Sequence, residues 1–369
     1  MGFLRGPVKG TLILLVIAGA LIAGLFAIQG RFAPRESAKD KIAFISDRGT
    51  HPDVWLMNAD GSSAKPLTRD VRQDGDLSWS HDATKIVFAS ERGGEAQVFR
   101  LWAMKDEQAR QLTVGSGVKL QPVFSPDGSR IAYISQGTVY VMSSEGEDIE
   151  PVLPVEVSDM ASESSAGFEK SPYAQIDWSA DGESLAAVQQ LDDVQVPQLL
   201  TSIGGELNPI ADTDGNIIAG ERVSVKWAPK GRVVAVSSVS KNNGVLVVRD
   251  YDSDILTILI SDLLPGRAAW APSGEMIAFE VMGYKPGHGY SSTGLGIANV
   301  DSGEHSVIIR GDVERPSWTA DGKRIIFTKA EKDGSRDIWS VSPDGKEAKN
   351  LTPGPGDDYD AVASPVGAE

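Results

Sequence analysis

One sequence pattern recurs along most of this 369-residue chain and limits what it can fold into. An aromatic residue is followed by a short polar turn of the Ser-Pro-Asp-Gly type and, seven positions after the aromatic, by an aliphatic residue. The six aromatic positions, spaced 43 to 54 residues apart, are Trp79, Phe124, Trp178, Trp227, Trp270 and Trp318. A period in the forties, made of short apolar runs and tight turns, is typical of a β-propeller with one four-stranded sheet per repeat.

Each part of the repeat has a local physical reason. The strand that carries the aromatic ends at a turn such as residues 125–128, where Gly128 adopts a positive φ at low cost. An Ile-Ala-Tyr type segment then begins the strand that pairs back. The chain contains 39 Gly and 20 Pro and has few helix-forming stretches after residue 30, so the sequence predicts an all-β fold.

The two ends of the repeat region together supply one more repeat. Residues 41–44 read as the second strand of a blade, yet no Trp-Ser-Pro-Asp-Gly segment precedes them. The missing segment aligns with residues 363–367, so residues 360–369 are expected to pair with residues 42–46. We therefore predict that residues 41–369 form a seven-bladed β-propeller closed by N-/C-terminal strand exchange, which leaves no open sheet edge at the ring junction.

The first forty residues differ from the rest. Residues 11–28 contain no charge and, at ~1.5 Å per residue, span ~27 Å as a helix, close to the hydrocarbon thickness of a bilayer. This predicts a tail at residues 1–10, one transmembrane helix at residues 11–30 and a linker at residues 31–40. A cleaved secretory signal is the alternative, but the run is long and no small-x-small site follows it. We expect a single-pass cell-membrane protein with its propeller outside the cytoplasm.

Charge and cysteine content exclude several functions. Residues 41–369 carry 30 basic and 49 acidic side chains, a net charge of −19, which repels nucleic acid and anionic headgroups. The chain has no Cys, which removes disulfides, thiolate metal sites and cysteine nucleophiles. We expect no nucleic-acid partner, and attachment to the membrane only through the chain's own helix.

These repeats resemble the TolB-like propellers, whose blades read Trp-Ser-Pro-Asp-Gly, Ile-Ala-Phe, Met-Asn-Ala-Asp-Gly and Leu-Thr. The segment at residues 42–68, with Met-Asn-Ala-Asp-Gly at residues 57–61, fits that pattern. The resemblance implies a role in protein recognition in the cell envelope. TolB itself has a separate N-terminal α/β domain and six blades, so the resemblance is to the family and its particular partners are not carried over.

The candidate chemistry in the sequence is sparse. The repeated tryptophans occupy one equivalent position per blade, which predicts packing between sheets. The four histidines, His51, His81, His288 and His305, are scattered, so no metal or cofactor site is predicted. No nucleophile elbow is present, and no catalytic residue is nominated.

Two segments depart from the repeat. Residues 154–173 lengthen one repeat and read as a polar loop. Residues 282–294 are rich in Tyr and Gly, a composition found at recognition surfaces, and predict that Tyr284, His288 and Tyr290 contact a partner. The alternative is an extended hairpin packed on its own blade.

The function expected from the sequence is a membrane-anchored, extracytoplasmic protein-protein interaction module. Such a module serves as an accessory subunit of an envelope or membrane complex, with other envelope or membrane proteins as partners. The alternative is a channel-based saccharide- or peptide-binding protein, or a lyase or hydrolase. A cluster of polar and titratable groups at one mouth of the central channel would favour that alternative.

Overall fold

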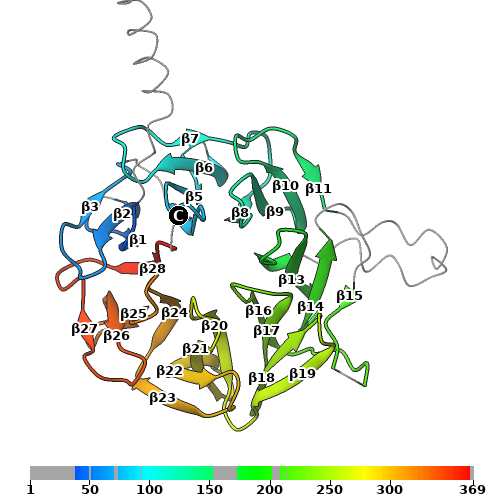
Figure 1. Cartoon of the computed structure of the whole chain (residues 1–369). Helices are drawn as coiled ribbons and strands as arrows, with labels where there is room; N and C mark the ends of the chain where they lie inside the picture. The colour runs from blue at the N-terminus through cyan, green and yellow to red at the C-terminus, as the bar shows by residue number, and fades with distance from the viewer. Residues whose placement is uncertain are drawn as a thin grey trace, which may run out of the picture. The chain divides into compact units, whose positions relative to one another are not determined.

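The computed structural model describes residues 38–49, 51–69, 74–92, 94–152, 173–201, 208–212 and 214–365, all within the unit Ser37–Glu369. These residues form seven four-stranded antiparallel sheets around a central axis (Figure 1), which confirms the predicted all-β, seven-bladed propeller. Within these ranges, no helix is long and apolar enough to span a membrane. The predicted transmembrane segment at residues 11–30 and nearly all of the polar loop at residues 154–173 lie outside the described residues.

Blades two to seven follow one another along the chain, and the first strand of each lies nearest the axis (Figure 1). Blade two contains β4 (Asp74–Trp79), β5 (Lys85–Ser90), β6 (Gln97–Trp102) and β7 (Arg110–Gln111), and blade three contains β8 (Lys119–Phe124), β9 (Arg130–Ser135), β10 (Thr138–Ser143) and β11 (Glu150–Pro151). Blade four contains β12 (Tyr173–Trp178), β13 (Ser184–Leu191), β14 (Val194–Thr201) and β15 (Asn208–Pro209), and blade five contains β16 (Arg222–Trp227), β17 (Val233–Ser240), β18 (Asn243–Asp250) and β19 (Ile255–Ile260). Blade six contains β20 (Pro265–Trp270), β21 (Met276–Lys285), β22 (Gly289–Asn299) and β23 (His305–Arg310), and blade seven contains β24 (Val313–Trp318), β25 (Ile325–Ala330), β26 (Arg336–Val341) and β27 (Lys349–Asn350).

Blade one draws on both ends of the propeller. Its strands, from the axis outward, are β28 (Asp358–Ala363), β1 (Lys41–Ser46), β2 (Asp53–Asn58) and β3 (Lys65–Pro66). Ile42 lies opposite Ala363, and Ser46 lies opposite Asp358. The C-terminal strand thus begins two residues before the predicted position. It ends at Ala363, because the residues that follow occupy the place of the Ser-Pro-Asp-Gly turn.

The core lies between neighbouring sheets. Phe44, Phe88, Phe279 and Phe327 occupy matching places on second strands and have no exposed surface. Burying one such side chain contributes ~1.5–3 kcal/mol. Because each sheet is apolar on both faces, only the blades beside it can cover it.

The repeated turn is held by side-chain hydrogen bonds. In blade three, Ser125 Oγ donates to Asp127 Oδ1 (2.6 Å) and accepts the Arg130 N–H (3.0 Å), while Asp127 Oδ1 accepts the Ser129 N–H (3.0 Å). Burial by itself raises the pKa of Asp127, but these hydrogen bonds outweigh it and the net pKa lies below its ordinary value. Gly128 has a φ of 69°, as the turn requires.

The tryptophans bridge neighbouring blades. Each indole N–H donates to a carbonyl on the inner strand of a neighbouring blade, in the pairs Trp79 to Val362 (3.0 Å), Trp178 to Val123 (3.3 Å), Trp270 to Lys226 (3.0 Å) and Trp318 to Ala269 (3.0 Å). All four indole rings are buried, which confirms their packing role. Trp227 is buried at the equivalent place in blade five, but its Nε1 has no hydrogen-bond partner among the described residues.

This difference predicts unequal costs for one conservative substitution. Trp318→Phe removes a donor and leaves the Ala269 carbonyl short of a partner, which costs ~1–3 kcal/mol in addition to the lost volume. Trp227→Phe loses a similar volume but also removes an unsatisfied donor. We expect urea denaturation to show a larger loss of unfolding free energy for Trp318→Phe. Equal losses would mean that packing alone matters.

Candidate functional site

A ring of polar side chains follows the innermost strands. The third residue before the aromatic position, or before its counterpart Ala363 in blade one, is polar in all seven blades. These residues are Asp76, Gln121, Gln175, Ser224, Arg267, Arg315 and Asp360. We call them the channel ring. The inner ladder is irregular at this level in six described sheets and regular only in blade five.

The irregular ladder shapes the backbone of the channel ring. Asp76, Gln121, Arg315 and Asp360 have φ values of 53°, 50°, 52° and 55°, in the left-handed region that side chains other than Gly rarely adopt. Strain of this kind costs of order 1–3 kcal/mol per residue and is often found at functional sites. Bulges redirect side chains, which here places polar groups on the strands nearest the axis.

One side of the channel ring is charged and internally paired. Arg315 Nε lies 2.8 Å from Asp360 Oδ1, and Arg315 Nη2 lies 4.0 Å from Asp76 Oδ1. Asp76 Oδ2 also accepts the Gln121 N–H (3.0 Å). Burial raises the pKa of Asp360, and the neighbouring Arg315 partly offsets that increase. Blades seven, one and two are therefore joined electrostatically across the axis.

Glu280 on β21 lies behind this ring and is 5% exposed. Its Oε1 accepts the Arg315 N–H (2.8 Å), and its Oε2 accepts the Arg267 N–H (3.2 Å). Burial raises the pKa of Glu280, although both hydrogen bonds lower it. The carboxylate thus ties the inner strands of blades six and seven together.

The other side of the channel ring opens into a cavity of about 110 Å³ between blades four, five and six. Its polar lining includes Gln175, Gln195, Ser224, Arg267 and Glu280. The sequence interpretation missed this site because the ring residues differ in type from blade to blade. Their constant distance from the aromatic was the signal that could have revealed them.

The predicted contact residues lie on the hairpin of β21 and β22. Tyr284 and Tyr290 are cross-strand partners with ring centroids 5.1 Å apart, and His288 is exposed in the turn. Tyr290 Oη donates to Glu221 Oε2 (2.7 Å) and accepts the Lys241 N–H, so the hairpin is bonded to blade five. Burial and the bond to Glu221 raise the pKa of Tyr290 to about 12. The structure brings the three residues together on one hairpin, with Tyr290 serving a structural contact.

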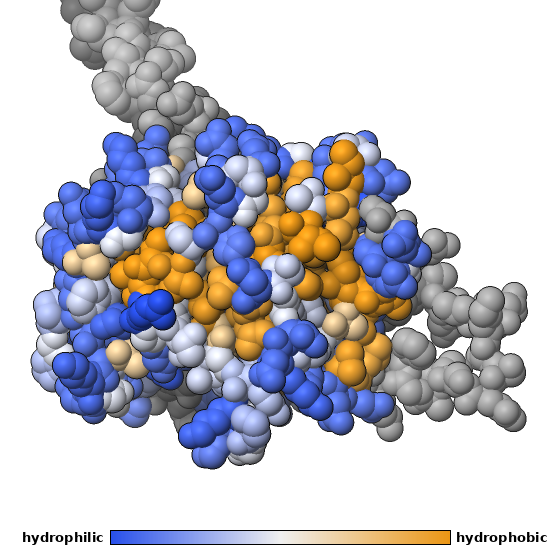
Figure 2. Space-filling model, turned by 90° about the horizontal axis from the view of Figure 1, so that it is seen from below, coloured by the Kyte–Doolittle hydropathy of each residue, from blue (hydrophilic) through white to orange (hydrophobic). Residues whose placement is uncertain are grey.

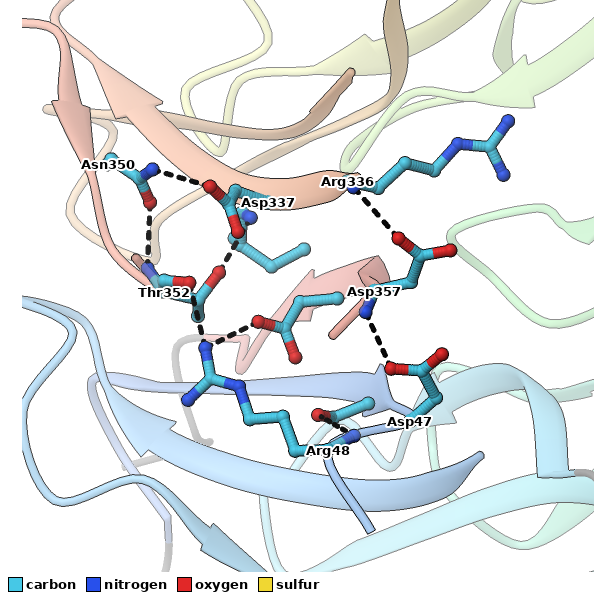
Figure 3. Close-up of polar contacts among 10 residues, drawn as sticks. Asp47, Arg48, Arg336, Asp337, Asn350, Thr352 and Asp357 are labelled. Carbon is cyan, nitrogen blue, oxygen red and sulfur yellow. Dashed lines mark hydrogen bonds and ion pairs between the residues drawn. The ribbon is translucent and has the colours of Figure 1, made fainter. Parts of the chain in front are cut away.

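A partly buried polar network joins blade one to the end of blade seven (Figure 3). The Arg48 guanidinium donates to the Thr352 carbonyl (2.8 Å) and pairs with Asp358 Oδ2 (2.5 Å), while the Asp357 N–H donates to Asp47 Oδ1 (2.6 Å). Burial raises the pKa of Asp358, and Arg48 lowers it in part. These contacts fasten the two ends of the propeller.

Histidine chemistry is limited in the described residues. His305 Nε2 lies 2.9 Å from Asp262 Oδ1, a contact between blades six and five. Across the described ranges, no three His, Cys, Asp or Glu side chains are grouped so that they could hold a metal ion.

An apolar area covers the outer side of blades five and six. Figure 2 views the molecule from the side on which these blades lie in Figure 1, and apolar residues gather across that surface. Ile255 and Ile258 on β19 are 56% and 61% exposed, and Val307, Ile308 and Ile309 on β23 are half-buried. We call these five residues the outer apolar surface.

Comparison with known proteins finds similarity to TolB propellers over part of the chain. Residues 26–150 match the family model described as TolB beta propeller domain. A stretch of 109 residues is 29% identical to the Tol-Pal system protein TolB of Campylobacter jejuni and covers 29% of this chain and 26% of that protein. The match thus spans about a quarter of that relative's length.

Solved structures share the fold at low identity. TolB from Acinetobacter baumannii has a TM-score of 0.55 and 13% identity, and the match covers 89% of this chain and 67% of that one. Oligogalacturonate lyase from Vibrio parahaemolyticus has a TM-score of 0.59 and 13% identity, with 85% and 86% covered. Identity this low shows a common architecture alone.

The hairpin geometry predicts different effects for its two tyrosines. Tyr290→Phe removes the hydrogen bonds to Glu221 and Lys241, and should lower the free energy of unfolding by ~1–2 kcal/mol. Tyr284→Phe is the matched control, because its hydroxyl bonds to no described residue, and should change stability by less than ~0.5 kcal/mol. Differential scanning calorimetry of both variants measures this. If Tyr290→Phe changes the free energy of unfolding as little as Tyr284→Phe does, the hairpin does not depend on its bonds to blade five.

Proposed function

We propose that this TolB-like propeller is an extracytoplasmic protein-interaction module whose partners are other envelope or membrane proteins. The observation that carries this proposal is the outer apolar surface of blades five and six. Contiguous exposed apolar surface on a soluble body marks an interaction site, whereas single exposed apolar residues are ordinary.

Outer-strand length supports this choice of surface. The outermost strands β19 and β23 each contain six residues, whereas the outermost strands of the other five described sheets contain two. A long apolar edge strand presents unpaired backbone groups and invites association unless a partner covers it. Blades five and six are neighbours, and Val307 on β23 packs against the cluster that contains Leu259 and Ile260 of β19, whereas Ile308 and Ile309 pack toward blade seven.

The charges around this surface favour one kind of occupant. Asp254 and Asp262 flank β19, and Glu304 and Asp312 flank β23; Asp254 pairs with Arg249 and Asp262 contacts His305, which leaves Glu304 and Asp312 as the carboxylates without an ion pair among the described residues. A second copy of the chain would bring these carboxylates against one another, which is unfavourable. The surface therefore fits a different protein with an apolar centre and a basic rim.

A paired substitution tests the surface. Ile255→Ser with Ile258→Ser should abolish photo-crosslinking of a partner through a probe at Val307 in native membranes. Ile217→Ser, at a residue 51% exposed in the loop between β15 and β16, is the matched control and should leave it unchanged. Glu304→Gln with Asp312→Asn should weaken the crosslink and its dependence on salt. The proposal would be refuted if crosslinks formed only between two copies of the chain, or if the crosslink yield were the same in all these variants.

The hairpin of β21 and β22 is proposed as a second contact with the same partner. Exposed His288 and half-buried Tyr284 support this role, whereas Tyr290 is occupied by blade five. A photo-crosslinker at His288 should then capture the protein that the Val307 probe captures.

We also propose that residues 11–30 form a single transmembrane anchor and that the β28 and β1 pairing closes the ring in solution. The uncharged run of residues 11–28 supports the anchor, and the ladder and the Arg48 network support the closure. The role of accessory subunit in an envelope or membrane complex follows from anchoring together with partner binding.

The anchor predicts how the protein behaves on extraction. The intact chain should stay with membranes through alkaline carbonate and dissolve only in detergent, because an apolar helix of this length is not displaced by charge. Replacing Leu15 and Ile17 by Lys should release it, since each buried Lys costs ~2.5–3.5 kcal/mol. A mature N-terminus beginning near Arg31 would show a cleaved signal instead.

A second candidate function is ligand binding in the central channel. The clustered polar and titratable groups of the channel ring are the observation that favours it. Neither a bound metal nor an assigned nucleophile is part of this candidate, so binding is proposed without a reaction.

A further inference from the structure

We infer that the cavity between blades four, five and six binds a single carboxylate, held by the Arg267 guanidinium and the Ser224 hydroxyl. This inference rests on the channel candidate and gives it a ligand chemistry. It is independent of the outer apolar surface, which lies on the opposite side of the same blades.

Arg267 supplies the positive charge. Its backbone N–H bonds to Glu280, but its guanidinium has no hydrogen-bond or ion-pair partner among the described residues, although it lines the cavity. Arg315, the next ring residue along the chain, is instead paired with Asp360. Burial and the neighbouring Arg315 lower the pKa of Arg267, while the charges of Glu280, Asp360 and Asp76 raise it in part. A bound anion would relieve the cost of burying this charge.

Ser224 supplies a spare donor. It is 6% exposed, lines the cavity, and its Oγ has no hydrogen-bond partner in the described structure. Leaving a buried hydroxyl unsatisfied costs ~1–3 kcal/mol. A ligand oxygen that accepts its proton would recover that energy.

The two amide side chains of the cavity are already engaged. Gln175 Nε2 donates to the Val225 carbonyl (2.8 Å), and Gln195 Oε1 accepts the Val223 N–H (2.7 Å). These amides fix the shape of the wall between blades four and five. Besides the exposed Arg222 guanidinium, which also lines the cavity, the groups without a bonded partner among the described residues are the Arg267 guanidinium and the Ser224 hydroxyl, a pair that can bind the two oxygens of a carboxylate.

Size and charge narrow the ligand further. A volume of about 110 Å³ has room for a carboxylate on a short stem, since one water takes ~30 Å³ of liquid. Glu280 also lines the cavity, and its negative charge opposes a doubly charged phosphate more strongly than a singly charged carboxylate. The ligand is thus a monoanionic carboxylate, either free or at the end of an extended peptide that enters the channel.

Calorimetric titration of the full chain in detergent tests this inference. Acetyl-tetraglycine with a free C-terminus should bind at least ten-fold more tightly than its C-terminal amide. Arg267→Gln and Ser224→Ala should each weaken binding of the free acid by about ten-fold, which corresponds to ~1.4 kcal/mol. Arg310→Gln, on the outer strand β23, is the matched control and should bind as the unchanged chain does.

Additional ligands and variants in the same titration identify the source of the carboxylate and show which results would contradict the inference. If N-acetylglycine binds as tightly as the tetrapeptide, the ligand is a small free carboxylate; tighter binding of the tetrapeptide indicates a peptide terminus. Equal binding of acid and amide, tighter binding of inorganic phosphate, or an unaffected Arg267→Gln variant that melts normally would overturn the inference. The Ile255→Ser and Ile258→Ser variant should bind the acid unchanged, which separates this site from the outer surface.

Discussion

The packing of each sheet against its two neighbours is the interaction on which the ring depends, and at four of the seven blade contacts a buried indole also donates its N–H to an inner-strand carbonyl. The inner strand is the edge of its sheet, so its outward carbonyls find no partner within their own ladder. The bonds from Trp79, Trp178, Trp270 and Trp318 satisfy one such carbonyl each and set the distance between sheets. Because every sheet needs a neighbouring sheet on both faces, no blade is stable without the next. The position of the channel ring therefore depends on all seven blades.

That regular scaffold carries an irregular set of charges. The channel ring has the same place in each blade, yet Arg315, Asp76 and Asp360 neutralise one another while Arg267 faces a cavity with no bonded partner. Backbone irregularities at this level store strain in the inner strands, as the left-handed residues show. A repeat fold can host binding in this way because the scaffold tolerates any polar residue at the ring position, and the choice of residue then decides which sector is free to bind.

The fold could be predicted from the sequence because each repeat contains residues with local structural requirements. These are Gly at a positive φ, Ser and Asp that close a turn, and an aromatic residue at a regular interval. The seven blades and the TolB-like character were confirmed. The channel ring was missed because its residues, which are Asp, Gln, Ser and Arg, differ in type from blade to blade. They share only their position, three residues before the aromatic position of each repeat. The bond from Tyr290 to Glu221 spans 69 residues and two blades, a distance at which composition carries no information. The partner contact of Tyr284, His288 and Tyr290 stays a prediction.

Blade one has a consequence for synthesis of the protein. The Lys41 N–H bonds to Ser364 Oγ, 323 residues away, and β1 pairs with β28 over nearly the same separation. During vectorial synthesis the first blade to emerge is therefore the last to be completed, and β1 keeps an unpaired apolar edge until nearly all other blades exist. Such long-range pairing folds slowly. The ring therefore stays open at blade one until β28 has been made, so closure of the propeller is coupled to the last part of synthesis.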